Sequence, residues 1–271
     1  MTIEIHSVDT VSQASAALGD SSRYFAGGTL LMRQVNYGDQ SINRLVISDD
    51  PVLKQVQVQG EQISIGAGVT MSQVLAHSDL QFLNEVARSV GGPAIRNMAT
   101  VGGNLFAPRP YGDFTTALLA LDAEILWADG RRQSLEQFLE QSYTSSTSNK
   151  GIVSSVSIQR PSSGAFRYLK VSRVKPKGVS LITIAAFLGR ENGRVGNARI
   201  AFGGMAAEPR RAKSAEQALQ GSSLDESGIQ RCLSACTEGM APQDDALASA
   251  WYRNQIAPVY LKRLLLQRSE Y

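Results

Sequence analysis

The sequence predicts an α+β protein with two domains. Short apolar and β-branched runs alternate with helical patterns over about the first 160 residues, which is typical of an α+β domain and not of a helix bundle or a β-sandwich. After them, three strand-like runs precede a series of helical patterns, so the second part is predicted to be an antiparallel sheet with helices. The length of 271 residues also suits two domains, since a domain averages roughly 150 residues.

The predicted elements of the first part follow from apolar spacing. Helices are predicted over residues 10–18, 29–35, 80–90 and 114–121, and strands over residues 23–26, 43–48 and 123–128. Residues 63–70 are predicted to form a strand that runs into a turn, and Thr70 is a suitable N-cap for a helix that begins at Met71. Asp129 and Gly130 form a strong turn signal after the strand that precedes them.

A change of composition marks the predicted domain boundary. Residues 142–150 are rich in Ser, Thr and Asn and are predicted to be a surface loop, and a Pro-Ser-Ser-Gly run follows at residues 161–164. We therefore expect domains at residues 1–162 and 163–271, with a break between two subdomains of the first near residues 50–58. In the second domain, strands are predicted over residues 166–174, 181–188 and 195–202, and helices over residues 212–219, 226–236 and 247–268.

Composition and charge exclude several classes of function. The chain has 27 Lys and Arg against 24 Asp and Glu, and no long basic run, so nucleic-acid binding is not indicated. Two Cys and two His cannot build an iron–sulfur cluster or a four-cysteine zinc site, and His6 and His77 lack partners at metal-ligand spacing. We expect no metal on this chain, and free thiols at Cys232 and Cys236. The N-terminal residues do not resemble a signal peptide and no long apolar run occurs, so a cytoplasmic location is expected.

The last predicted helix is amphipathic and basic, which leaves two interpretations open. Its aromatic and aliphatic residues are interleaved with Arg253, Lys262, Arg263 and Arg268. Such a helix binds a membrane or a partner, or it packs on its own domain with a solvated basic face, which is the commoner case.

Two glycine pairs are candidate phosphate-binding segments. Residues 25–31 read Phe-Ala-Gly-Gly-Thr-Leu-Leu, where a strand ends and a helix begins, and residues 95–105 contain a second Gly-Gly between a Thr and an Asn. A strand-to-helix junction presents backbone N–H groups, and glycine lets a phosphate approach the main chain. Each pair alone is also explained as a tight turn. The chain has no G-x-x-x-x-G-K-[ST] motif and only a fragment of G-x-G-x-x-G at residues 66–68, so a P-loop or Rossmann site is not expected.

Taken together, these segments resemble a known family. The chain resembles the FAD-binding medium subunit of the molybdenum hydroxylases in the order and spacing of five segments. These are residues 25–31, 65–70 and 92–104, then Gly112-Asp113 and the Ala-Leu-rich run at 117–123. That family includes xanthine dehydrogenase and carbon monoxide dehydrogenase. The resemblance continues into the second domain, through the segments at residues 167–170, 184–187, 198–205 and 209–212.

The resemblance implies a fold and a set of FAD ligands. The fold is a two-part FAD-binding domain of the p-cresol methylhydroxylase and vanillyl-alcohol oxidase type, followed by a smaller α+β domain. By position, one side of the FAD diphosphate would be bound by Ala26, Gly27, Gly28, Thr29, Leu30 and Leu31. The other side would be bound by Thr100, Gly102, Gly103 and Asn104. Asp113 matches an acid of the flavin cavity, where it would accept a hydrogen bond from a ribityl or ribose hydroxyl, and Lys170 matches a position near the isoalloxazine.

Some positions depart from the family pattern. Many relatives carry a polar residue where this chain has Leu30, so one polar contact at the start of that helix is missing. Arg109 and Tyr111 replace small polar residues. This pair either influences the flavin or a partner, or it is a solvated Arg and a packed Tyr in a loop braced by proline.

The resemblance also implies an assembly. A large partner subunit would hold the molybdenum cofactor and hydroxylate the substrate, and a small partner subunit would carry two [2Fe–2S] clusters. Electrons would pass from those clusters to the FAD of this chain and on to NAD+, a quinone or oxygen, within a dimer of heterotrimers. Electron transfer requires no catalytic side chain, and no catalytic constellation is apparent. A self-sufficient flavin oxidase or dehydrogenase, and a flavin-free scaffold subunit, remain alternatives.

Overall fold

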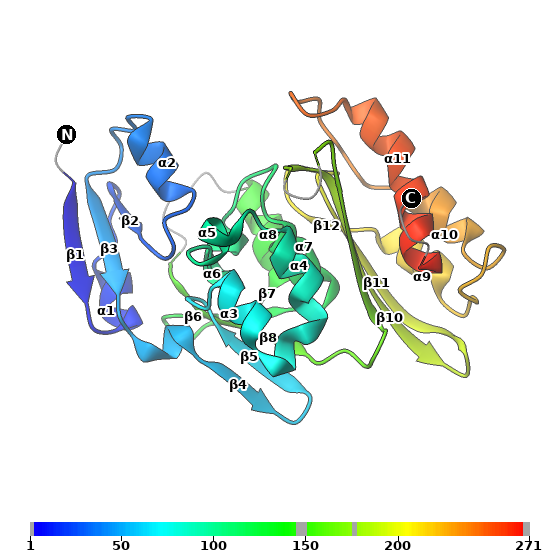
Figure 1. The fold of residues 1–271 in the computed structure, drawn as a ribbon, viewed down its shortest axis with the longest axis horizontal. Helices are drawn as coiled ribbons and strands as arrows, with labels where there is room; N and C mark the ends of the chain where they lie inside the picture. The colour runs from blue at the N-terminus through cyan, green and yellow to red at the C-terminus, as the bar shows by residue number, and fades with distance from the viewer. Residues whose placement is uncertain (1–2, 145–150, 175–177, 268–271) are drawn as a thin grey trace. The chain divides into compact units, whose positions relative to one another are not determined.

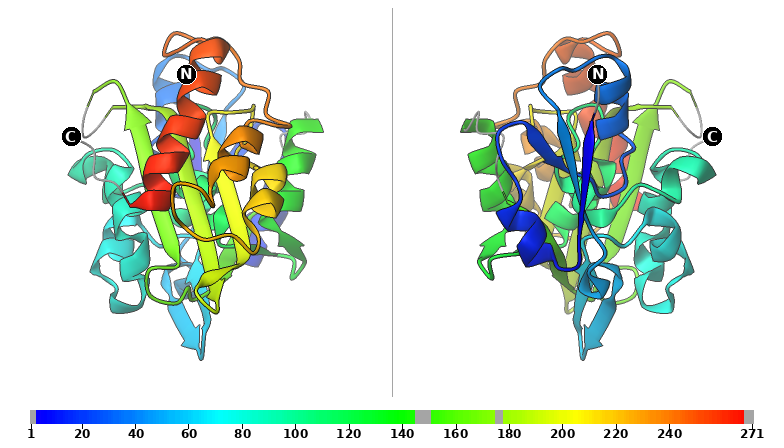
Figure 2. Two further views of the ribbon diagram at one scale, coloured as in Figure 1. Left: turned by 90° about the vertical axis from the view of Figure 1, so that its right-hand side faces the viewer. Right: turned by 90° about the vertical axis from the view of Figure 1, so that its left-hand side faces the viewer.

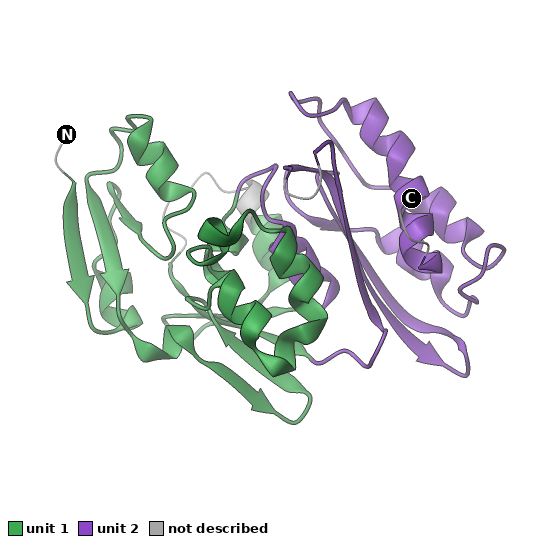
Figure 3. Cartoon of the chain, in the orientation of Figure 1, with its two compact units in different colours: residues 1–107, 123–159 green, residues 108–122, 160–271 purple. Residues whose placement is uncertain are grey.

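The computed structural model describes residues 3–144, 151–174 and 178–267 (Figure 1). The chain divides into two compact units, one of residues Met1–Ala107 with Ala123–Gln159 and one of residues Pro108–Asp122 with Arg160–Tyr271 (Figure 3). Both units combine helices with sheets, and the predicted α+β fold class is confirmed. Residues 108–122 belong to the second unit, although they precede the predicted domain boundary near residue 162.

The first unit begins with a small parallel sheet. Its strands are β1 (Glu4–Val8), β2 (Ser22–Tyr24) and β3 (Arg44–Ser48), in the order β1-β3-β2, as the right-hand view of Figure 2 shows. Helix α1 (Val11–Ala16) links β1 to β2, and helix α2 (Leu31–Asn36) links β2 to β3. Thr10 caps α1 in a capping box, which explains where that helix starts. The helices and strands predicted in this region are confirmed, with β1 added.

A five-stranded antiparallel sheet forms the rest of the first unit, in the order β4-β5-β8-β6-β7. Its strands are β4 (Val56–Gln59), β5 (Gln62–Gly66), β6 (Glu124–Trp127), β7 (Arg132–Ser134) and β8 (Val153–Gln159). The helices before and between them are η1 (Pro51–Lys54), α3 (Met71–Ala76), η2 (Ser78–Leu83), α4 (Asn84–Ser89), α5 (Pro93–Arg96), α6 (Val101–Leu105) and α8 (Leu135–Thr144). Thr70 caps α3 as predicted.

Two predictions for this unit need correction. The single helix expected over residues 80–90 is a 3-10 helix, η2, followed by α4. Leu80, Leu83, Val86 and Ala87 are all buried, so one apolar stripe runs through both helices and apolar spacing could not separate them. The loop expected over residues 142–150 starts too early, because α8 continues to Thr144; residues 145–150 lie outside the described residues.

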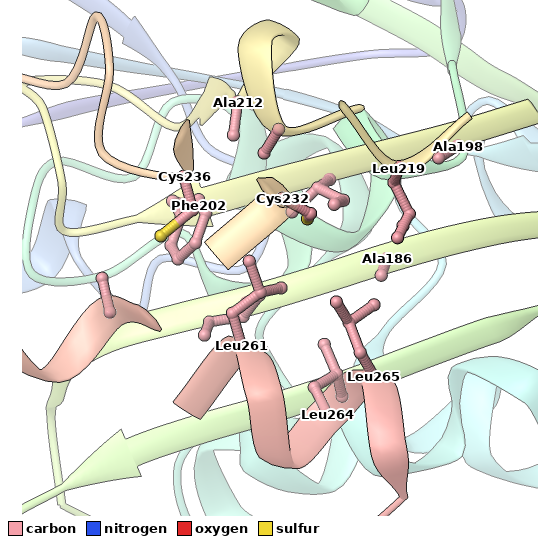
Figure 4. Packing of buried hydrophobic residues seen from close by; sticks show 14 of the residues in the cluster. Ala186, Ala198, Phe202, Ala212, Leu219, Cys232, Cys236, Leu261, Leu264 and Leu265 are labelled. Atoms are coloured by element: carbon pink, nitrogen blue, oxygen red, sulfur yellow. The ribbon is translucent and has the colours of Figure 1, made fainter. Parts of the chain in front are cut away.

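The second unit is built on the antiparallel sheet β12-β11-β10-β9. Its strands are β9 (Phe166–Ser172), β10 (Ser180–Glu191), β11 (Arg194–Gly203) and β12 (Arg210–Arg211), and the three long ones confirm the predicted strands. Helices α9 (Lys213–Leu219), α10 (Gln230–Ala235) and α11 (Ala250–Leu266) cover one face, as the left-hand view of Figure 2 shows. Every second residue of β10 from Ile182 to Leu188 faces them, in the core drawn in Figure 4.

Helix α7 (Asp113–Ala120) packs against β10 and β11. It contacts the strand residues that lie between those of the core and therefore point to the other face of the sheet. Thr183 Oγ1 donates a hydrogen bond to Thr116 Oγ1 at 3.3 Å, and a Cβ at Gly203 would lie only 2.6 Å from the same Thr116 oxygen. At the other end of α7, Arg199 Nε donates to the carbonyl oxygen of Ala120 at 3.0 Å, which satisfies a C-terminal carbonyl of the helix. These contacts explain why residues 108–122 belong to the second unit.

Helix α11 packs on the sheet of its own unit. Leu261, Leu264 and Leu265 belong to its apolar core, while Trp251 near the start of the helix is 70% exposed. Packing on its own domain, the commoner of the two interpretations of this basic helix, therefore accounts for its buried face. No helix in the described part of the chain combines the length and the apolar character needed to cross a membrane.

The two cysteines are expected to be unreactive in the folded protein. Cys232 and Cys236 are fully buried free thiols in the core around α10, and burial, with a smaller effect of neighbouring groups on Cys232, raises the pKa of each to about 12. Because the thiolate is the reactive form, neither should react with a thiol reagent at pH 8. The native chain should therefore react with no thiol reagent, and the denatured chain should react with two equivalents of it. Rapid labelling of the native chain would contradict this packing.

Candidate functional site

The first glycine pair lies in the turn between β2 and α2. Gly28 has φ +67°, a left-handed conformation that favours glycine. A Cβ on Gly27 would collide with the carbonyl oxygen of Met98, so the backbone at Gly27 lies directly against the segment that precedes α6. The protein's own packing therefore requires glycine at both positions.

The same turn offers a row of backbone donors. The amide groups of Gly27, Gly28, Thr29, Leu30 and Leu31 donate to no acceptor within the described residues. Successive N–H groups in a turn that enters a helix form a concavity suited to an anion. Ala26 is exposed and the five residues after it are half-buried, so the row is not covered by protein. The predicted first side of a diphosphate site is consistent with this geometry.

The second glycine pair has a different construction. Gly102 and Gly103 lie in α6 and not in an open loop, and Thr100 is the N-cap, whose Oγ1 accepts from the amide of Gly103 at 3.0 Å. The amides of Val101, Gly102 and Asn104 donate to carbonyl oxygens at 2.8–3.1 Å. This segment therefore has its own amides occupied, and of residues 100–104 only Gly103 is exposed. Asn104 is buried and its Nδ2 donates to the carbonyl oxygen of Thr100 at 2.9 Å.

Residues 66–70 hold the second segment in place. Thr70 and Thr100 form an isolated antiparallel bridge, with amide-to-carbonyl distances of 2.9 Å from Met71 to Ala99 and from Val101 to Val69. A Cβ on Gly102 would lie 2.8 Å from that of Ala67. A Cβ on Gly66 or Gly68 would collide with the carbonyl oxygen of Leu53, so these two glycines have a packing role.

Asp113 and Lys170 are brought together in the second unit. Asp113 is the first residue of α7, Lys170 lies on β9, and Lys170 Nζ is 2.9 Å from Asp113 Oδ2. The two side chains are only 10% and 12% exposed. Ser180 Oγ at the start of β10 donates to Asp113 Oδ1 at 2.6 Å. The two predicted site residues of this unit therefore form one polar cluster, with a third member that the sequence did not indicate.

Tyr24 lies just before the first glycine turn. Burial, assisted by the negative charges of Asp50 and Asp49, raises the pKa of its phenol to about 12. The phenol consequently stays protonated at physiological pH and adds no negative charge beside the turn.

The positions that depart from the family pattern are well defined. Leu30 is the N-cap of α2 and makes no side-chain capping hydrogen bond. Arg109 Nη2 donates to Gln243 Oε1 at 2.8 Å, within the second unit. Tyr111 is 38% exposed. Among the described residues, no group of three His, Cys, Asp or Glu side chains could hold a metal ion.

Family models match almost the whole chain. The model described as the FAD binding domain in molybdopterin dehydrogenase matches residues 1–161, and that of the CO dehydrogenase flavoprotein C-terminal domain matches residues 167–268.

Individual relatives agree with these matches. The chain is 25% identical to the glyceraldehyde dehydrogenase medium chain of Sulfolobus acidocaldarius over 253 residues, which are 89% of this chain and 88% of that one. It is 26% identical to the carbon monoxide dehydrogenase medium chain of Afipia carboxidovorans over 275 residues, which are 97% and 95% of the two chains. The solved carbon monoxide dehydrogenase of Hydrogenophaga pseudoflava shares the fold, with a TM-score of 0.90 at 23% identity over 98% of this chain and 96% of that one.

The contact between the two glycine segments predicts a stability difference. Gly27→Ala should lower the free energy of unfolding by about 1–3 kcal/mol, because the added methyl group meets the backbone of Met98 and forces a shift. Gly19→Ala is the matched control in the same unit, since its Cβ would meet only Ser22 Oγ, at 4.0 Å, and the change should stay within about 0.5 kcal/mol. Denaturant titration measures both, and equal stability of the two variants would contradict the packing of Gly27.

Proposed function

Because the chain belongs to the family of FAD-binding medium subunits of the molybdenum hydroxylases, and is thus the flavin subunit of an oxidoreductase, we propose that it is an electron-transfer subunit. Its FAD receives electrons from the [2Fe–2S] clusters of a small partner subunit and passes them to an external acceptor. A large partner subunit holds the molybdenum cofactor and hydroxylates the substrate. The relatives' names support such an assembly, since they describe medium chains of dehydrogenases.

One observation carries the assignment of the cofactor site. The amides of residues 27–31 donate to no acceptor in the part of the chain that the structure describes, and they form a row of donors at a helix entrance, which suits a diphosphate without a lysine partner. The residues present therefore fit FAD at this place.

The proposed FAD ligands fall into three sets. Ala26, Gly27, Gly28, Thr29, Leu30 and Leu31 bind the diphosphate through their main chain. Thr100, Gly102, Gly103 and Asn104 supply a hydroxyl donor, a close backbone approach and the positive end of α6. Asp113 and Lys170 form a charged pair whose carboxylate accepts from hydroxyl groups of the cofactor and whose ammonium group supplies a positive charge.

FAD supplies the redox chemistry when bound, since it can accept electrons one at a time and release them in pairs. The residues of this chain bind it, orient it and set the charge around it. The proposal requires no nucleophile or acid–base pair. It leaves the substrate to the large subunit, in agreement with relatives named for such different substrates as glyceraldehyde and carbon monoxide. The candidate electron acceptors are NAD+, a quinone and oxygen. The proposed assembly is a dimer of heterotrimers, and its proposed location is the cytoplasm.

The cofactor content of the purified complex tests the proposal. We expect the chain to copurify with a molybdenum-containing and an iron–sulfur subunit, and to release one FAD per chain on denaturation. Reduction of the complex by its substrate should bleach the flavin absorption. A chain that is fully folded but binds no FAD when the cofactor is added would refute the assignment and favour the flavin-free scaffold.

A charge at Gly103 tests the diphosphate site directly. Gly103 is exposed in the first turn of α6, and a Cβ there would meet only Thr100 Oγ1, at 2.9 Å. Gly103→Asp places a carboxylate where it suits the helix but repels a diphosphate, so FAD affinity should fall by at least about tenfold relative to Gly103→Asn. FAD titration monitored by flavin fluorescence measures both, and thermal unfolding verifies that the two variants are equally stable. Equal FAD affinities would remove α6 from the diphosphate site.

A further inference from the structure

The carboxylate of Asp113 is held from two directions by side chains of the second unit. Lys170 Nζ lies 2.9 Å from Oδ2, and Ser180 Oγ donates to Oδ1 at 2.6 Å. Ser180 is 6% exposed and Asp113 8% exposed, so water competes little for these contacts. An ionised carboxylate has about four acceptor positions, and each oxygen therefore keeps capacity for a further donor.

A bulge in β10 turns Ser180 toward α7. Ser180 pairs with Ser172 of β9, but the next paired residue is Ile182 with Val171, so Leu181 is an extra residue in the ladder. Without the bulge, Ser180 and Thr183, which are three positions apart, would point to opposite faces of the sheet, because side chains alternate along a strand. With it, both hydroxyls reach α7: Ser180 bonds to Asp113 and Thr183 to Thr116.

A buried arginine stabilises the bulge. Arg253 on α11 is 1% exposed, and its Nε donates to the carbonyl oxygen of Leu181 at 3.1 Å. Its Nη2 is 2.8 Å from both carboxylate oxygens of Asp245, and its Nη1 donates to the carbonyl oxygens of Gln243 and Ala248. The guanidinium group is thus fully engaged, and it fixes the backbone one residue after Ser180.

We propose that Ser180 is a positioning residue for FAD, which holds the Asp113 carboxylate in the orientation in which Asp113 and Lys170 contact the cofactor. This inference rests on the proposed function, in which that pair binds FAD. Without the Ser180 hydroxyl, Oδ1 loses this donor, and the contact of Lys170 with Oδ2 restricts rotation about the terminal torsion of Asp113 only weakly. Binding of the cofactor must then also order the Asp113 side chain, and the free-energy cost of this ordering weakens the affinity for FAD.

Two substitutions on one strand separate positioning from packing. Ser180→Ala removes the hydroxyl that bonds to Asp113, and Thr183→Val removes the hydroxyl that bonds to Thr116 while keeping the side-chain shape. Both residues are buried on β10 and both bond to α7. Each full-length variant is stripped of cofactor and titrated with FAD. Ser180→Ala should raise the dissociation constant for FAD about tenfold, which is the scale of one hydrogen bond to a charged group. Thr183→Val should leave that constant within about twofold of the unmodified chain.

A double-mutant cycle with Asp113→Ala identifies the route of the effect. If Ser180 acts through Asp113, adding Ser180→Ala to Asp113→Ala leaves the dissociation constant for FAD unchanged. If Ser180 merely supports the fold, its effect persists in that background, and the proposal is overturned. It is also overturned if Ser180→Ala binds FAD like the unmodified chain. Failure of the unmodified chain to bind FAD would instead overturn the proposed function, so the two failures are distinguishable.

Discussion

The attachment of α7 to the sheet of the second unit is the constraint on which the proposed chemistry of that unit depends. This helix precedes the sheet in sequence by more than 40 residues, yet its first residue, its middle and its last turn are bonded to three strands of that sheet. Asp113 meets β9 and β10, Thr116 meets β10, and the C-terminal carbonyl of Ala120 meets Arg199 of β11. Because three separate contacts fix the helix, the carboxylate at its N-terminus has one defined position.

Glycines of both segments pack closely against the chain, and the first segment in addition offers amides to a ligand. Gly27 and Gly102 lie so close to neighbouring chain segments that a methyl group would not fit, and the amide of Gly102 is already used. The amides from Gly27 to Leu31 are unused within the described residues, so the first glycine segment is the one equipped to receive an anion. In the second segment, the exposed Gly103 in the first turn of α6 is the accessible feature. The two sides of the proposed diphosphate site thus act by different means.

Patterns that are local in sequence predicted much of this molecule, and contacts between distant residues account for the rest. The α+β class, the three long strands of the second unit and the cap at Thr70 follow from alternation and capping signals within a few residues. The bond from Ser180 to Asp113 joins residues 67 positions apart, and no local pattern indicates that bond or the bulge at Leu181. Likewise, the pairing of the α6 amides depends on the 66–70 segment, so a Gly-Gly motif alone could not show that they are occupied.

Amide hydrogen exchange of the full-length chain, with and without FAD, locates the diphosphate. The amides of residues 27–31 should exchange rapidly without FAD and become strongly protected with it. The amides of Val101 and Gly102, which are bonded to carbonyl oxygens in either case, should change little. Unchanged exchange at residues 27–31 in a chain saturated with FAD would contradict the account, because the diphosphate would then lie elsewhere.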